Sequence, residues 1–376
     1  MRQLTVLTSQ GSDIKHLSSQ EEEAVTIADA DNQPRSSTCK ERRHFAFLKV
    51  PKAGSSTVQN IFYRFGFNRN LTFLLPRFAN FISYFPVIEK DNIIPPPKGK
   101  RYEAMCNHVV YNRTAFRLSL PVDSVFVSIL RNPTTHLSSY LNYFHGHVFH
   151  GSKALEEYLV NPDLYSSWKG PRKIVPNIMA NYFGLPERHQ REATRHIVSD
   201  YLMQIETDFD FIIILERLDE SLLLMKRKFC WKLKDIVYEK KQATALQKQR
   251  QLPDITVLRQ FRLVAQVDFA LYEHFLSELS NAVLKEERDT GDFNDELSYF
   301  RTIRDVIKRF CKSATPKIDN GTLRINASKW NDSFEWTTLD CRLLQMEELE
   351  LLKFIGQQQY GVKEWQTLHT SKSKLV

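Results

Sequence analysis

The sequence has no long apolar segment: no stretch approaches the roughly 18 consecutive apolar residues of a membrane-spanning helix. The N-terminus also lacks the apolar core of a signal peptide. The longest apolar region, residues 71–88, is interrupted by prolines and polar side chains. We therefore expect a soluble chain with no membrane anchor in this sequence.

The five cysteines have none of the spacings that are typical of metal sites, which argues against a structural zinc. Their odd number fixes no disulfide framework, so a Cys311–Cys341 bridge and two free thiols are both open alternatives. Several Asn-X-Ser/Thr sequons favour a protein that passes through the secretory lumen. Their acceptor residues are Asn70, Asn112, Asn320, Asn326 and Asn331.

Basic residues outnumber acidic ones, 52 against 44, which gives a formal net charge of +8. This balance suits an anionic cofactor, acidic glycans or a membrane surface. The basic residues are scattered, without a long run or a stripe interleaved with aromatic side chains. Nucleic-acid binding is therefore the weaker alternative, and we predict no nucleic-acid partner.

The length of 376 residues, 42% of them hydrophobic, allows a large buried core. Residues 1–40 are polar and lack apolar periodicity, so we predict a disordered N-terminal tail there. Residues 41–376 are predicted to form a single domain. Within that domain, residues 286–376 are expected to be a helical and irregular C-terminal part.

Residues 49–57 form a loop of small residues between a predicted strand at 44–50 and a predicted helix that Gly66 ends. The N–H groups of residues 54–57 would converge at the helix N-terminus, where the dipole favours an anion. Lys52 adds a positive charge, and the Ser and Thr hydroxyls add donors. The loop is not a Walker motif, because the lysine precedes the glycine and the first glycine is missing. We interpret it as a phosphate or sulfate site; a plain strand-to-helix turn is the alternative.

Continuous apolar runs at residues 124–130 and 209–215 predict two further buried strands. Helices are expected at 133–144, with Asn132 as N-cap, at 218–229 and at 258–284, whereas 73–97 is expected to be a loop and 170–186 to be rich in loop. Strands that alternate with helices in this way are typical of an α/β fold with a parallel sheet covered on both faces. In such sheets, ligands bind beyond the carboxyl ends of the strands.

Arg131 ends the second of these strands, and Ser139 lies about two turns into the following helix. An arginine can bind a phosphate with two hydrogen bonds, and the serine hydroxyl can donate a third. By itself Arg131 is more typical of a surface or capping arginine. Together with the Lys52 loop at the same sheet edge, it indicates a ligand with two separate anionic groups.

These residues match a known family. Residues 49–57 resemble the 5′-phosphosulfate loop of Golgi carbohydrate sulfotransferases, and Leu130-Arg-Asn-Pro133 with Ser139 resembles their 3′-phosphate site. The block from Phe209-Asp-Phe through Glu216-Arg-Leu-Asp-Glu-Ser-Leu222 to Cys230-Trp resembles the galactose-3-O-sulfotransferase family more narrowly. So does the segment 268–275. The resemblance covers about residues 44 to 285.

The resemblance implies a P-loop-like sulfotransferase fold, with a central parallel sheet flanked by helices on both faces, over the domain 41–376. It implies 3′-phosphoadenosine 5′-phosphosulfate as donor, no metal, and a galactose-terminated glycolipid or glycan as acceptor, sulfated at the galactose 3-hydroxyl. It also implies the Golgi lumen or membrane as location. The residues that it assigns to donor binding are Lys52, Ala53, Gly54, Ser55, Ser56, Thr57, Arg131 and Ser139.

For catalysis, Lys52 would stabilise the oxygen that leaves with the donor phosphate, and a base would take the acceptor's proton. His108, in Cys106-Asn-His-Val-Val-Tyr111, resembles a base histidine of related sulfotransferases; a hydrogen-bonded histidine in a short strand is the equal alternative. Glu216 ranks second as base, and His136 is expected to be structural. The sequence departs from the family pattern at Tyr182, where an acidic residue is expected, and in its missing anchor.

Two other functions compete with this one. A phosphotransferase with a P-loop would need a magnesium ligand, which Glu216 or Asp219 could supply at a strand end. An inactive glycan-binding relative on the same fold is the other alternative. The joint presence of Lys52, His108 and Arg131 argues against it.

Overall fold

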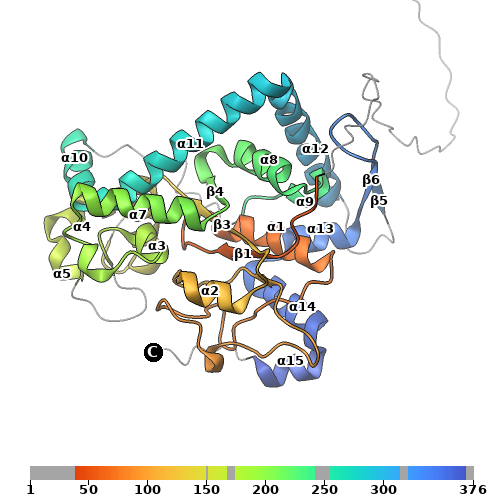
Figure 1. The fold of residues 1–376 in the computed structure, drawn as a ribbon, viewed down its shortest axis with the longest axis horizontal. Coiled ribbons are helices and arrows are strands. Elements are labelled where there is room, and N and C mark those ends of the chain that lie inside the picture. Colours follow the sequence, from red (N-terminus) through yellow and green to blue (C-terminus); the bar gives the residue numbers. More distant parts are fainter. Residues whose placement is uncertain (1–38, 150, 167–173, 242–253, 314–320, 370–376) are drawn as a thin grey trace, which may run out of the picture.

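The computed structural model describes residues 39–149, 151–166, 174–241, 254–313 and 321–369 (Figure 1). The predicted N-terminal tail therefore lies almost entirely outside the described residues. All the residues that the sequence assigns to donor binding and catalysis lie within them.

A four-stranded sheet forms the centre, and its strand order is β2-β1-β3-β4 with every pair parallel. The strands are β1 (Phe45–Leu48), β2 (Ala104–Met105), β3 (Val125–Leu130) and β4 (Phe211–Ile214). The predicted α/β class with a central parallel sheet is thus confirmed. The short edge strand β2 was not predicted, because two residues carry no recognisable alternation.

The sheet is covered on both faces. Every residue of β1 and β3 is buried, although successive side chains of a strand point to opposite faces. On one face, the rings of Phe45 and Phe47 lie 4.8 and 5.0 Å from that of Phe62, which belongs to α1 (Ser55–Phe67). Burial of these aromatic side chains fixes α1 against the sheet, so its N-terminus is held at the carboxyl end of β1.

Helices make up most of the rest of the described chain (Figure 1). The helices α3 (Pro133–Phe144) and α8 (Leu218–Phe229) agree with the prediction. Asn132 is the N-cap of α3, as expected: its side chain accepts hydrogen bonds from the backbone N–H groups of Thr134 and Thr135. The other α-helices are α2 (Arg113–Ser119), α4 (Ala154–Val160), α5 (Pro162–Ser166), α6 (Ile178–Tyr182), α7 (Arg195–Asp208), α9 (Leu233–Ile236), α10 (Ile255–Val264), α11 (Gln266–Thr290), α12 (Phe293–Ser313), α13 (Thr338–Gln345), α14 (Glu348–Tyr360) and α15 (Val362–Leu368). A hairpin of β5 (Thr322–Ile325) and β6 (Phe334–Thr337) lies beside α12 (Figure 1).

Two predicted helix boundaries were wrong. Gly66 does not end α1, which continues to Phe67; a Cβ at Gly66 would meet the ring of Phe73 at 2.3 Å, so the glycine serves close packing instead. The helix predicted at 258–284 is two helices, because Ala265 leaves the helical conformation between α10 and α11. The described part of the segment expected to be rich in loop, residues 174–186, contains the five-residue helix α6.

At the break, the start of α11 is capped by a side chain from a distant segment. The side-chain oxygen of Asn177 accepts hydrogen bonds from the N–H groups of Val267 and Asp268 at the start of α11, 2.9 and 3.0 Å away. In return, the Asp268 carboxylate accepts from the first N–H groups of α6. Each side chain thus caps the other's helix, a long-range pairing that no local pattern reveals.

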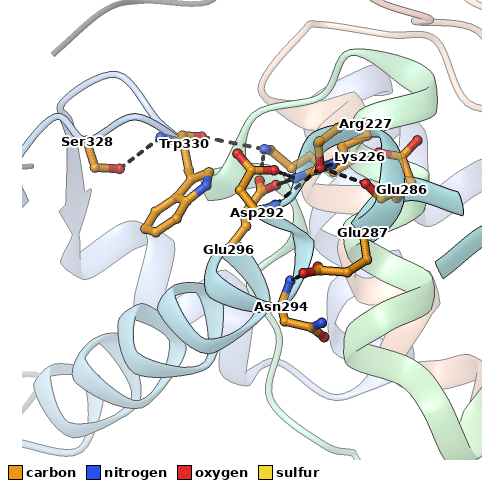
Figure 2. Close-up of polar contacts among 10 residues, drawn as sticks. Lys226, Arg227, Glu286, Glu287, Asp292, Asn294, Glu296, Ser328 and Trp330 are labelled. Atoms are coloured by element: carbon orange, nitrogen blue, oxygen red, sulfur yellow. Dashed lines mark hydrogen bonds and ion pairs between the residues drawn. The ribbon is translucent and has the colours of Figure 1, made fainter. Parts of the chain in front are cut away.

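A cluster of charged side chains around the buried Glu296 connects α8 to α11 and α12 (Figure 2). Arg227 contacts Glu286 at 2.6 Å and Asp292 at 2.9 Å, and its Nε donates to Glu296 at 2.7 Å. Lys226 also pairs with Glu296, whose side chain is 2% exposed. Buried charges are tolerated when each has a partner, so this cluster holds the three helices in one register.

The C-terminal helices α13 and α14 pack on α1, the helix that follows the Lys52 loop (Figure 1). The Asn60 amide of α1 donates to the carbonyl of Leu343 at 2.8 Å. A disulfide joins Cys311 to Cys341, which decides between the two alternatives left open for this pair, and a second joins Cys39 to Cys230. The C-terminal part is therefore anchored onto the helix that begins at the candidate site.

Candidate active site

The backbone of the Lys52 loop is held in an unusual conformation between β1 and α1. Lys52 and Gly54 both have positive φ, 61° and 77°. At Gly54 a Cβ would lie 2.4 Å from a methyl carbon of Leu215, which directly follows β4. Glycine is therefore required there both for the left-handed conformation and for the close approach of the segment that follows β4.

The hydroxyls of the loop, predicted as ligand donors, have protein partners. Ser55 donates to the carbonyl of Val50 at 2.6 Å, which closes the loop on itself. Ser56 donates to Glu348 at 3.1 Å, and the Thr57 hydroxyl accepts from the N–H of Lys241 at 2.9 Å. The Thr57 N–H donates to the Gly54 carbonyl. A part of the predicted donor set therefore shapes the loop, and its role in binding stays a prediction.

Lys52 projects from the loop toward α3, and its ammonium lies 3.7 Å from the ring centroid of Tyr143. Burial, together with the positive charge of Arg131, lowers the pKa of Lys52 to about 8. A cation that is partly desolvated and faces another cation gains stability from an anion placed between them. The two residues thus form an electropositive spot at the end of the sheet.

Arg131 directly follows β3, beside the strand that precedes the Lys52 loop. Its Nη1 donates to the carbonyl of Lys52 at 2.8 Å, and its Nε donates to the Thr135 hydroxyl at 3.0 Å. Ser139 lies four residues beyond Thr135 in α3, so the two share a helix face. The structure therefore brings together the two segments that the sequence predicts as anion sites.

His136 lies inside this arrangement, and its Nε2 donates to the carbonyl of Pro51 at 2.8 Å. Burial lowers the pKa of His136 to about 3, so the imidazole is neutral at physiological pH. This hydrogen bond connects α3 to the loop. The geometry agrees with the structural role expected for it.

His108 follows the edge strand β2 and lies beside the start of the loop. Its Nδ1 donates to the carbonyl of Lys49 at 3.0 Å, and its ring stacks on Phe81 with centroids 4.5 Å apart. A proton on Nδ1 leaves Nε2 as the basic nitrogen of the neutral ring. That nitrogen faces Glu348, 4.0 Å away.

Glu216, the second candidate base, accepts a hydrogen bond from the N–H of Asn132 at 2.9 Å and another from the Tyr272 hydroxyl at 3.2 Å. Its carboxylate therefore supports the segment that carries Arg131. The sequence placed Glu216 at the correct strand end but gave no indication of this contact.

The prediction from the sequence did not include a buried group of polar side chains beside the loop. Lys49 is 1% exposed and pairs with Glu348, and it also donates to Gln59 at 2.7 Å. Asn80 donates to the same carboxylate at 2.6 Å. Glu348 lies more than 260 residues from Lys49 and Asn80 in the sequence, so no local motif could have joined them.

Comparison with known proteins identifies the family. The family model described as galactose-3-O-sulfotransferase matches residues 3–333. The chain belongs to the galactose-3-O-sulfotransferase family. Human galactose-3-O-sulfotransferase 2 is 30% identical over 281 residues, which is 73% of this chain and 70% of the relative.

Galactosylceramide sulfotransferases are also similar to this chain. The human protein is 28% identical over 245 residues, 63% of this chain, and the bovine protein is 25% identical over 297 residues, 77% of this chain. The aligned regions span 57% of the human and 69% of the bovine relative. The family is thus one of sulfotransferases, as the sequence motifs predicted.

The sequence predicts neither a metal site nor a membrane-spanning helix, and the described part of the chain can be compared with both predictions. There, no group of three or more His, Cys, Asp or Glu side chains is arranged to hold a metal ion. None of the helices in the same residues combines the length and apolar character needed to cross a bilayer. That the reaction needs no metal stays a prediction.

Proposed function

We propose that this protein transfers a sulfuryl group from 3′-phosphoadenosine 5′-phosphosulfate to the 3-hydroxyl of a terminal galactose on a glycolipid or a glycoprotein glycan. The observation that carries the proposal is the hydrogen bond from Arg131 to the carbonyl of Lys52, 2.8 Å long. It places two cationic segments, from two adjacent parallel strands, at one sheet edge. Family membership and the named activities of the relatives support the same reaction.

The donor carries anionic groups at both ends of its ribose, which suits this pair of segments. Residues 52–57, from the Lys52 loop into the first turn of α1, would bind the 5′-phosphosulfate in the manner of a P-loop. Arg131 and Ser139 would bind the 3′-phosphate and so fix the position of the nucleotide. An arginine that is already oriented by Thr135 loses little freedom on binding.

In the reaction, the acceptor oxygen forms a bond to sulfur as the bond from sulfur to the bridging phosphate oxygen breaks. The phosphate leaves with the electron pair, and the positive charge of Lys52 stabilises the charge that develops on it. His108 would take the proton of the acceptor hydroxyl on Nε2. Positioning and charge stabilisation provide most of the acceleration, as in phosphoryl transfer.

The proposed location is the Golgi lumen. Two disulfides indicate an oxidising compartment, and the sequon asparagines Asn70 and Asn326 are exposed. The acceptor would then be a galactoside of the secretory pathway.

Incubation of the purified protein with radiolabelled donor and a panel of galactosides tests the proposal. Galactosylceramide, lactosylceramide and galactose-terminated N-glycans would be compared with the same acceptors blocked at the galactose 3-hydroxyl. We expect label on at least one free acceptor, none on its blocked form, and a loss of two or more orders of magnitude in kcat for His108→Ala. Absence of transfer to every acceptor, or turnover of ATP with magnesium, would contradict the proposal.

A further inference from the structure

Glu348 begins α14, the C-terminal helix that packs on α1, and lies beyond the residues that the family model matches. Its carboxylate contacts four other segments. Lys49 at the end of β1 pairs with it, Ser56 in the first turn of α1 donates at 3.1 Å, and Asn80 donates at 2.6 Å. The Nε2 of His108 lies 4.0 Å away.

The carboxylate is ionised in this setting. Burial alone would raise the pKa of Glu348, but the charges of Lys49 and His108 outweigh it and lower the pKa to about 2. Burial lowers the pKa of Lys49, and Glu348 opposes this effect. With its side chain 1% exposed, Lys49 cannot contact a substrate.

We propose that Glu348 is a positioning residue of the transfer site, which fixes the His108 ring and supplies the counter-charge for its protonated form. The inference rests on the proposed function, because it assigns Glu348 a part in that reaction. As the acceptor O–H bond breaks, the proton moves to Nε2 of His108 and creates an imidazolium. A carboxylate 4.0 Å from that nitrogen stabilises the new charge and so favours the transfer.

The surroundings of His108 make Glu348 the source of this stabilisation. The other titratable groups at the cluster are Lys49, Tyr63 of α1 and Cys106. Burial raises the pKa of both Tyr63 and Cys106, so neither carries a charge at neutral pH. Asn80 and Phe81 are uncharged. Glu348 therefore provides an anionic group that faces the ring.

A purely structural role is the competing explanation, in which Glu348 merely neutralises Lys49. Two variants separate the explanations. Glu348→Gln keeps the shape but removes the charge, and the double variant Lys49→Met/Glu348→Gln removes both charges, so that no buried cation is left unpaired. Glu350→Gln, an exposed position in the same helical turn, is the matched control.

The titration of His108 is measured by NMR on protein with labelled histidines, with the signal assigned from His108→Asn, and transfer kinetics are measured on the same proteins. In both Glu348 variants we expect the His108 midpoint to fall by roughly one pH unit and kcat to fall at least about tenfold, with the acid limb of the rate profile at lower pH. The control should match the wild type.

An unchanged His108 midpoint in both variants, or wild-type kcat in the double variant, would overturn the role of Glu348. If the wild type itself transfers no sulfate, the proposed function fails. The titration still reports whether Glu348 acts on His108, because it needs no activity.

Discussion

Binding of the donor's nucleotide should be coupled to proton uptake by Lys52 at mildly alkaline pH. Lys52 has a pKa of about 8, because it is partly desolvated and faces Arg131. An anion bound at its ammonium favours the charged form, so binding restores the lysine's ordinary pKa. The nucleotide's own phosphates are almost fully ionised above pH 7.5 and contribute little.

The magnitude follows from the pKa of about 8. Lys52 should be charged in about 90% of molecules at pH 7, in about half at pH 8 and in about 10% at pH 9. Binding should therefore take up about 0.1 proton at pH 7 and about 0.5 proton at pH 8. Over the same range, from pH 7 to pH 9, the dissociation constant should rise about tenfold.

Calorimetric titration with adenosine 3′,5′-bisphosphate, in buffers of different ionisation enthalpy, measures this uptake directly. The Lys52→Met variant, which keeps the length of the side chain but not its charge, should bind more weakly and take up no proton at pH 8. Equal uptake by this variant and the wild type would refute the assignment of Lys52 to the nucleotide's anionic end.

Two further changes test the framework of the site. Gly54→Ala should lower the free energy of unfolding by about 2–5 kcal/mol in denaturant titration, because alanine resists the left-handed conformation and its Cβ would meet Leu215. The control Gly99→Ala also has positive φ but has open space around the new Cβ. It should lower the free energy of unfolding by no more than about 1–2 kcal/mol. Glu296→Ala should cost about 3–5 kcal/mol, because it removes a buried carboxylate that pairs with two partly buried cations. The more exposed Glu286→Gln should cost about 1 kcal/mol or less, and equal losses would contradict the proposed role of the cluster.

The sequence predicted the features that local patterns determine. Apolar runs located three of the sheet's strands, and the Asn132 cap located the start of α3. The spacing of Lys52 and Gly54 after a strand predicted a loop at a helix N-terminus, and the parallel sheet implied that Arg131 would lie at the same edge. Their proximity follows from topology, which those patterns are sufficient to give.

Contacts between segments that are distant in the sequence could not be predicted from these local patterns. Nothing near Glu348 in the sequence indicates that α14 packs on α1 or that its carboxylate reaches His108. Similarly, the partners of Ser56 and Thr57 come from segments far along the chain, so hydroxyls that appear available in the sequence are engaged in the fold. Tertiary packing decides such pairings, and only the folded structure reveals them.

The central claim is that one nucleotide is bound at both ends, by the Lys52 loop and by the segment from Arg131 to Ser139. A crystal structure of the protein with adenosine 3′,5′-bisphosphate tests it most directly. We predict that the 5′-phosphate lies within hydrogen-bond distance of the Lys52 ammonium, and that the 3′-phosphate contacts Arg131 and Ser139. A nucleotide bound elsewhere, or in contact with only one of the two segments, would contradict it.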